Sequence, residues 1–215
     1  MDSMRPHTTT ALSSNFPVDW GVAQITLEGE TECGDSHLVG AYPDGLLIAV
    51  VDGLGHGAEA AAAAQAAVAI LGEHLQEPAI SLLNRCHEAL KPTRGAALSL
   101  ASFNVTYGTM TWLGVGNVEG VLLRADKEAV PVQENVMLFP GVAGHQLPAL
   151  RAAVTPVYPG DLLIFFTDGI RQDFLSEPPI PGHSPQRIAD RICTRYRKGT
   201  DDALVLAARY AGGLR

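Results

Sequence analysis

The sequence predicts an α+β fold, an αββα sandwich in which two mainly antiparallel sheets are flanked by helices. Strand-like segments follow one another in hairpins through the middle of the chain, whereas helical segments gather early and late, unlike a regular βαβ alternation. Some strands, such as residues 46–51, are apolar at every position and are therefore expected to be covered on both faces. The chain has 215 residues, 47% of them hydrophobic, which suits one domain with a full core.

The elements can be placed in order from periodicity and turn signals. Residues 1–12 are expected to form a flexible tail, followed by a single domain over residues 13–215. The turn Pro43-Asp44-Gly45 predicts a hairpin, and an alanine-rich run predicts the first helix. Strands are expected over residues 18–28, 37–42, 46–51, 97–104, 109–115, 120–124, 136–139, 152–157, 162–167 and 203–208. Helices are expected over residues 58–76, 78–90, 169–175 and 185–198.

The bulk properties exclude several classes of protein. A net charge of −8 argues against non-specific nucleic-acid binding, which needs a basic face, and is compatible with an acidic cleft that binds cations. Cys33, Cys86 and Cys193 have no metal-ligand spacing, so reduced thiols are expected. The polar N-terminus lacks the apolar segment of a signal peptide, and no run is long enough to span a bilayer. We therefore expect a cytoplasmic, monomeric protein with no nucleic-acid or membrane partner.

Two apolar strands end in the same dipeptide, Asp52-Gly53 and Asp168-Gly169. A third carboxylate, Asp201, comes just before the last strand. Because strand ends and neighbouring strand starts share one edge of an antiparallel sheet, these carboxylates are expected to meet there. Two bare carboxylates about 4 Å apart repel by about 4 kcal/mol at an effective dielectric near 20, so they must protonate, separate or bind a cation. Carboxylates without His or Cys partners favour Mg²⁺ or Mn²⁺.

Two other interpretations of these residues stay open at this point. Asp-Gly is a common turn pair, so each aspartate could simply cap a turn. The glycine-rich segment Gly53-Leu54-Gly55-His56-Gly57 lies between a strand and a helix and could hold a nucleotide phosphate. Its spacing differs from G-x-G-x-x-G, and no P-loop Lys-Ser/Thr follows, so this alternative is the weaker one.

The segment from Val51 to Ala61, VDGLGHGAEAA, resembles the signature of the PPM (type 2C) metal-dependent protein serine/threonine phosphatases, in their SpoIIE/RsbU/RsbX branch. Further matches come in the family's order and span about residues 30–208: Gly34-Asp35, Gly95-Ala96-Ala97, Gly116-Asn117, Pro159-Gly160-Asp161, Phe166-Thr167-Asp168-Gly169 and Asp201-Asp202. The resemblance implies the same αββα sandwich and a site that holds two Mn²⁺ or Mg²⁺ ions.

The resemblance also implies roles for individual residues. Asp52 would bridge the two ions, and the Gly53 carbonyl would bind one of them. Asp168 and Asp201 would complete the coordination of the other ion. Asp35 would lie behind these ligands and hold a metal-bound water. A water between two such cations is aligned for in-line attack on phosphorus. His56 would either protonate the leaving serine or threonine oxygen or merely pack at the helix start.

The chain departs from the family pattern in two places. Residues 29–35 contain no arginine to hold the phosphate, and Asn117 stands where many members have an aspartate for a third metal ion. Few residues precede the domain, as in the stand-alone, RsbX-like members of the branch, whose substrates are phosphorylated STAS-domain proteins of the stressosome. The resemblance therefore implies a phosphorylated regulatory protein, of this STAS type, as partner. The alternative from another class is a non-catalytic phosphoprotein-binding module of the same fold.

A basic stripe is expected on the late helix, where Arg187, Arg191 and Arg195 recur every fourth residue. Such a stripe is most often a solvated helix face paired with acids such as Asp190. The other interpretation is a docking surface for an acidic phosphoprotein.

Overall fold

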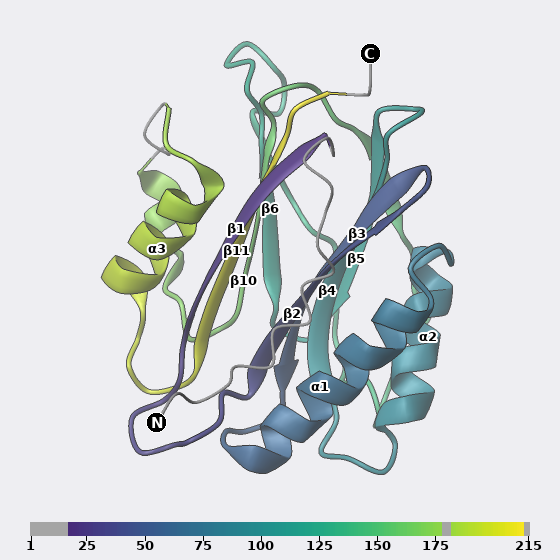
Figure 1. The fold of residues 1–215 in the computed structure, drawn as a ribbon, viewed down its shortest axis with the longest axis vertical. Coiled ribbons are helices and arrows are strands. Elements are labelled where there is room, and N and C mark those ends of the chain that lie inside the picture. The colour runs from purple at the N-terminus through teal and green to yellow at the C-terminus, as the bar shows by residue number, and fades with distance from the viewer. Residues whose placement is uncertain (1–16, 178–181, 213–215) are drawn as a thin grey trace.

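The computed structural model describes residues 17–177 and 182–212, so the expected tail over residues 1–12 lies outside the described residues. Two sheets face one another, with helices on their outer sides (Figure 1). The first sheet has the order β1 (Val18–Ile25), β11 (Ala203–Tyr210), β10 (Leu162–Phe166), β6 (Glu119–Leu123) and β7 (Gln133–Asn135). The second has the order β2 (Asp35–Tyr42), β3 (Gly45–Gly53), β4 (Ala96–Asn104), β5 (Thr109–Val115) and β8 (Leu138–Phe139). A further strand, β9 (Ala153–Pro156), also pairs with β5.

The pairing is antiparallel throughout both sheets except between β5 and β8, which run parallel. The αββα sandwich with mainly antiparallel sheets is therefore confirmed. No helix in the described part of the chain is long and apolar enough to cross a membrane.

Apolar side chains alternate along the central strands between the two sides of each sheet. The residues that point between the sheets include Leu46, Ile48 and Val50 of β3 and Leu163 and Phe165 of β10. Their neighbours in sequence point outward to the helices: Leu47, Ala49 and Val51 of β3, and Leu162, Ile164 and Phe166 of β10. Both faces of these strands are thus buried, as their apolar runs predict.

The helices cover the outer faces. On the second sheet, α1 (Ala58–Glu73) packs against β2 and β3, and α2 (Ala79–Leu90) packs against β4 and β5. On the first sheet, α3 (Pro185–Tyr196) packs against β1 and β11 beside the short 3₁₀ helix η1 (Gln172–Ser176). The buried face of α1 is mostly alanine, which lets its backbone approach the sheet closely.

Apart from shifted ends, the structure differs from the sequence expectation most clearly at two elements. The strand expected over residues 136–139 is shortened to β8, which pairs with β5. It is preceded by the unexpected strand β7, which pairs with β6 before the chain crosses to the other sheet at the buried Val136. The helix expected over residues 169–175 is η1, which starts later. The Gly169 carbonyl accepts a hydrogen bond from Lys198 N, and Arg171 N donates to the Tyr196 carbonyl, so these groups cannot build an α-helical turn there.

Candidate active site

Four carboxylates from both sheets lie at one edge of the sandwich. Asp35 begins β2 and is paired directly with Asp52 near the end of β3. Asp168 follows β10, and Asp201 precedes the neighbouring β11. Asp52 lies close enough to Asp168 and Asp201 to be repelled by both. The structure therefore brings together the aspartates that the sequence placed at strand ends.

Asp35 links the two sheets at this edge. Its side chain is buried, and its Oδ2 accepts a hydrogen bond of 2.8 Å from the Thr167 hydroxyl. The same Thr167 oxygen accepts from the backbone N–H of Leu204 at 2.9 Å, so the contact fixes the end of β10 against β2. Burial raises the pKa of Asp35 well above its usual value, and repulsion from Asp52 raises it further.

Asp52 is repelled by several neighbouring carboxylates at the edge. Burial, and then repulsion from Asp168 and Asp201, raises its pKa to about 7. The amide of Asn117 donates to Asp168 Oδ2 at 2.6 Å and also interacts with Asp52, whose pKa it lowers slightly. None of the ion pairs within the described ranges involves Asp35, Asp52, Asp168 or Asp201. A cluster of carboxylate oxygens without a basic partner fits Mg²⁺ or Mn²⁺ in charge and in ligand chemistry.

The cluster is open rather than a closed ligand set. Among the described residues, no three His, Cys, Asp or Glu side chains stand close enough together to hold one ion by themselves. Ions at this edge would therefore need further oxygen ligands, such as water or the Gly53 carbonyl. Mg²⁺ commonly retains several waters when it binds to proteins.

Asp202, next to Asp201, has a structural role that the sequence analysis missed. Its buried carboxylate accepts hydrogen bonds from the backbone N–H groups of Leu27 (2.8 Å) and Gly34 (2.7 Å). These bonds hold the loop that leads into β2 and end β1 earlier than expected. Among the described residues, the Asp201 side chain accepts only from Asp202 N (2.9 Å), and it is less buried than Asp202, so it is the one available to a cation.

The glycines of the two Asp-Gly pairs are required by close contacts with other backbone. A Cβ on Gly53 would lie 2.0 Å from the carbonyl oxygen of Ala60 in α1. A Cβ on Gly169 would lie 1.9 Å from the carbonyl oxygen of Asp202. Both approaches are far shorter than any van der Waals contact, so each aspartate is followed by glycine because a helix or strand passes directly against it.

His56 lies at the rim of the site and has a carboxylate partner. Its Nδ1 is 2.6 Å from Glu30 Oε1, and both side chains are partly exposed. Electrostatic interaction with Asp201 shows that the imidazole is near the carboxylate cluster. Arg94, from the loop before β4, lies against Gly55 and pairs with Glu59 of α1. Glu30 and Arg94 were missed because no local motif marks either of them.

The basic stripe on α3 is more neutral than its sequence suggests. Arg191 and Arg195 both donate to Glu177 Oε2, at 3.0 and 3.3 Å, whereas the Arg187 side chain is exposed. Asp190, the expected partner, instead accepts from Gln186. Burial of Cys33, Cys86 and Cys193 raises the pKa of each thiol, to about 12, 12 and 11, and all three are free.

The sandwich and its carboxylate-lined edge define a PP2C-type phosphatase domain. Residues 42–211 match the family model of stage II sporulation protein E, SpoIIE. The chain belongs to this SpoIIE family.

Two kinds of relative support the assignment. Phosphoserine phosphatase RsbX of Bacillus subtilis (strain 168) is 36% identical over 184 residues, which cover 84% of this chain and 89% of the relative. A crystal structure of RsbX in complex with magnesium matches with a TM-score of 0.79 and 25% identity, over 93% of this chain and 98% of that chain. A structure from work on the bacterial stressosome, described as a modular system adapted to control secondary messenger signalling, matches with a TM-score of 0.81 and 29% identity. The match covers 89% of this chain and 99% of that chain.

Proposed function

We propose that this protein is a Mn²⁺- or Mg²⁺-dependent phosphatase that removes phosphate from serine or threonine of a phosphorylated regulatory protein. The observation that carries the proposal is the convergence of Asp35, Asp52, Asp168 and Asp201 without a basic partner, in a chain of the SpoIIE family. Relatives named phosphoserine phosphatase and RsbX with magnesium support the reaction and the cofactor.

Individual residues of the chain would have the following roles in the reaction. Asp52 would bridge two cations, with Gly53 through its carbonyl, Asp168 and Asp201 as further ligands. When bound, the two cations would activate a water and neutralise phosphate oxygens. Asp35, fixed by Thr167, would orient that water as a hydrogen-bond acceptor. His56, oriented by Glu30, would donate a proton to the leaving oxygen of serine or threonine.

The proposed substrate is a STAS-domain protein of a stressosome, in the cytoplasm. A structure from stressosome work is among the matches to this chain, and the three free thiols suit a reducing compartment. The residues 13–215 would act as one domain, and the domain is expected to act as a monomer.

The proposal is tested by turnover of para-nitrophenyl phosphate and of a phosphoserine-containing STAS-domain protein encoded beside this chain. We expect turnover with Mn²⁺, loss on chelation, and loss of at least about 10³-fold in Asp52→Asn, because the bridging charge is gone. Metal-dependent binding of the phosphoprotein without turnover would support the alternative, a binding module. Stabilisation by a nucleotide without divalent cations would contradict both.

A further inference from the structure

The outer faces of the two sheets are covered unequally. Two long helices lie over the second sheet, α1 on β2 and β3, and α2 on β4 and β5. On the first sheet, α3 covers β1 and β11 (Figure 1). The short η1 contacts the neighbouring strand β10 through Phe174 and Phe166, and β6 through Gln172 and Glu119. The place beside α3 that corresponds to the second helix of the other layer is therefore left without one in the described chain.

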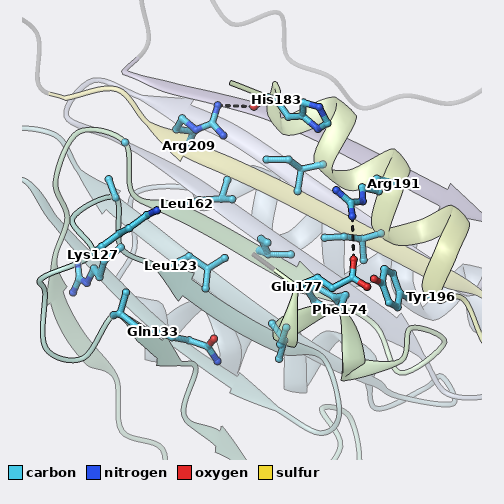
Figure 2. A pocket seen from close by; sticks show the side chains of 18 residues that line it. Leu123, Lys127, Gln133, Leu162, Phe174, Glu177, His183, Arg191, Tyr196 and Arg209 are labelled. Atoms are coloured by element: carbon cyan, nitrogen blue, oxygen red, sulfur yellow. Dashed lines mark hydrogen bonds and ion pairs between the residues drawn. The ribbon is translucent and has the colours of Figure 1, made fainter. Parts of the chain in front are cut away.

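A groove of about 530 Å³ occupies this place, between α3, η1 and the loop that joins β6 to β7. Most of its lining is apolar: Leu123, Leu162 and Ile164 come from the strands, Ile188 and Ile192 from α3, and Phe174 from η1. Figure 2 shows the strand residues along one side of the groove and Phe174, Glu177 and Tyr196 along the other. None of the active-site carboxylates lines it.

Cations surround the groove on a protein whose net charge is −8. Lys127 stands on the β6–β7 side, Arg191 on α3, and Arg209 at a third position near His183 (Figure 2). Among the described lining residues the one acid, Glu177, is shared by Arg191 and Arg195, so two cations face one carboxylate and one positive charge on α3 stays unbalanced. The apolar floor is thus bordered by positive charge on more than one side.

We propose that this groove binds an acidic, amphipathic α-helix of a partner protein. Such a helix would present an apolar stripe to Leu123, Leu162 and Ile188, and carboxylates on its two flanks to Lys127 and Arg191. A helix laid into an apolar groove, with anchors at i, i+3, i+4 and i+7, is a recurring recognition mode. A small amphipathic anion fits less well, because the cations around the groove stand apart and its single charged group could contact only one of them.

The helix would complete the outer layer of the first sheet, beside α3, as α2 completes that of the second sheet beside α1. The contact lies apart from the carboxylate edge. It extends the proposed function by giving the phosphatase an anchoring surface for a protein, and binding to it can be measured without turnover.

Fluorescence anisotropy with a labelled synthetic peptide tests the proposal on the full chain. The peptide has about five helical turns, with leucine at i, i+3, i+4 and i+7 and glutamate on both flanks. Val132→Glu places a negative charge on a half-exposed residue that lines the groove, and Lys127→Glu reverses a charge at its border. Val130→Glu is the matched control, because Val130 is 97% exposed, two residues away, and outside the groove.

We expect saturable binding that Val132→Glu and Lys127→Glu each weaken at least about 10-fold, while Val130→Glu binds like the parent chain. Thermal unfolding of each variant shows that the fold is kept. A peptide of the same composition in scrambled order should not bind. Equal binding of the scrambled peptide, equal effects of all three substitutions, or no binding at all would overturn the proposal. Binding of decanoate but not of the peptide would also overturn it. Because the readout is binding, failure here leaves the phosphatase proposal standing, and the reverse also holds.

Discussion

At the scale of residues, the adjacent Asp201 and Asp202 have different roles. Asp202 accepts backbone hydrogen bonds from Leu27 and Gly34, whereas Asp201 lies at the carboxylate cluster and accepts only from its neighbour in the structure. An acidic pair before a strand predicts a ligand but not which of the two serves. The hydrogen bonds decide it, because a carboxylate that already accepts two backbone donors has a fixed orientation.

Exchanging each aspartate for alanine should separate stability from catalysis. Asp202→Ala leaves two backbone N–H groups without their acceptor and should lower the free energy of unfolding by about 2–6 kcal/mol, since each orphaned donor costs about 1–3 kcal/mol. Asp201→Ala removes one of the mutually repelling carboxylates, so it should not lower the unfolding free energy by more than about 0.5 kcal/mol, and it should abolish para-nitrophenyl phosphate turnover. Urea titration without divalent cations measures the first effect. Similar losses of stability in both variants would contradict this division.

The pair of His56 and Glu30 allows a second test at this scale. If His56 donates a proton to the leaving oxygen, His56→Ala should slow hydrolysis of a phosphoserine peptide by about 10²-fold. Hydrolysis of para-nitrophenyl phosphate should fall much less, because its phenolate leaves without protonation. Glu30→Gln should act in the same direction but more weakly, since it removes only the negative charge beside Nδ1 and keeps an oxygen that can accept from it. Equal losses on both substrates would instead indicate that His56 packs at the start of α1 without transferring a proton.

At the scale of elements, α1 packs closely against the end of β3 because Gly53 has no side chain. The carbonyl of Ala60 occupies the space that a Gly53 side chain would need. The Asp-Gly pair therefore belongs to helix–sheet packing as much as to the site, and the carboxylate of Asp52 is placed by that packing.

Gly53→Ala should destabilise the fold by about 3 kcal/mol or more, because the backbone of α1 must move to admit the methyl group. Gly72→Ala is the matched control. Gly72 is exposed in the same helix, and the nearest atom to an added Cβ is 4.0 Å away, so the substitution should stabilise the protein by up to about 1 kcal/mol. Chemical unfolding in the absence of metal measures both. A neutral Gly53→Ala would show that the contact between α1 and β3 yields easily.

The elements that the sequence predicted well are those with a strong local signal. Apolar runs such as 46–51 and 162–167 gave central strands, and the alanine-rich run gave α1. The crossing between β7 and β8 was not predictable, because a short segment around Val136 can pair with either sheet and tertiary packing decides.

Asp52 and Asp168 could be placed from strand ends. Glu30, Asp202 and the partner of Arg191 could not, since their contacts join segments far apart in the chain.

At the scale of the whole molecule, the fold gathers negative charge at one edge and positive charge around a groove on another face. The charge at the edge opposes folding of the metal-free protein. Burial and mutual repulsion raise the pKa of Asp52 to about 7 and that of Asp35 well above its usual value. A folded state that binds a proton more tightly than the unfolded chain is stabilised by that proton.

The stability of the metal-free protein should therefore fall as pH rises through the interval between the ordinary aspartate pKa near 4 and the raised pKa near 7. Asp52 contributes its full stabilisation below about pH 4 and loses it as pH approaches 7. We expect Tm in chelator to drop by about 5 °C between pH 5 and pH 7.5 from this group. Asp52→Asn should show a flatter dependence, because its amide does not titrate. If the Tm of the parent chain depended on pH as little as that of Asp52→Asn, the inferred repulsion between carboxylates at the edge would be contradicted.

Divalent cations should reverse this dependence, because they compete with protons for the same carboxylates. Mn²⁺ should raise Tm strongly at pH 7.5, where Asp52 is largely ionised, and little at pH 5, where a proton occupies it. The gain follows ligand concentration as expected for binding to the folded state alone. In Asp52→Asn the gain at pH 7.5 should shrink, whereas Asp190→Asn, which removes a carboxylate of α3 bonded to Gln186, should keep it. An equal gain at both pH values would mean that the cation binds elsewhere on this acidic protein.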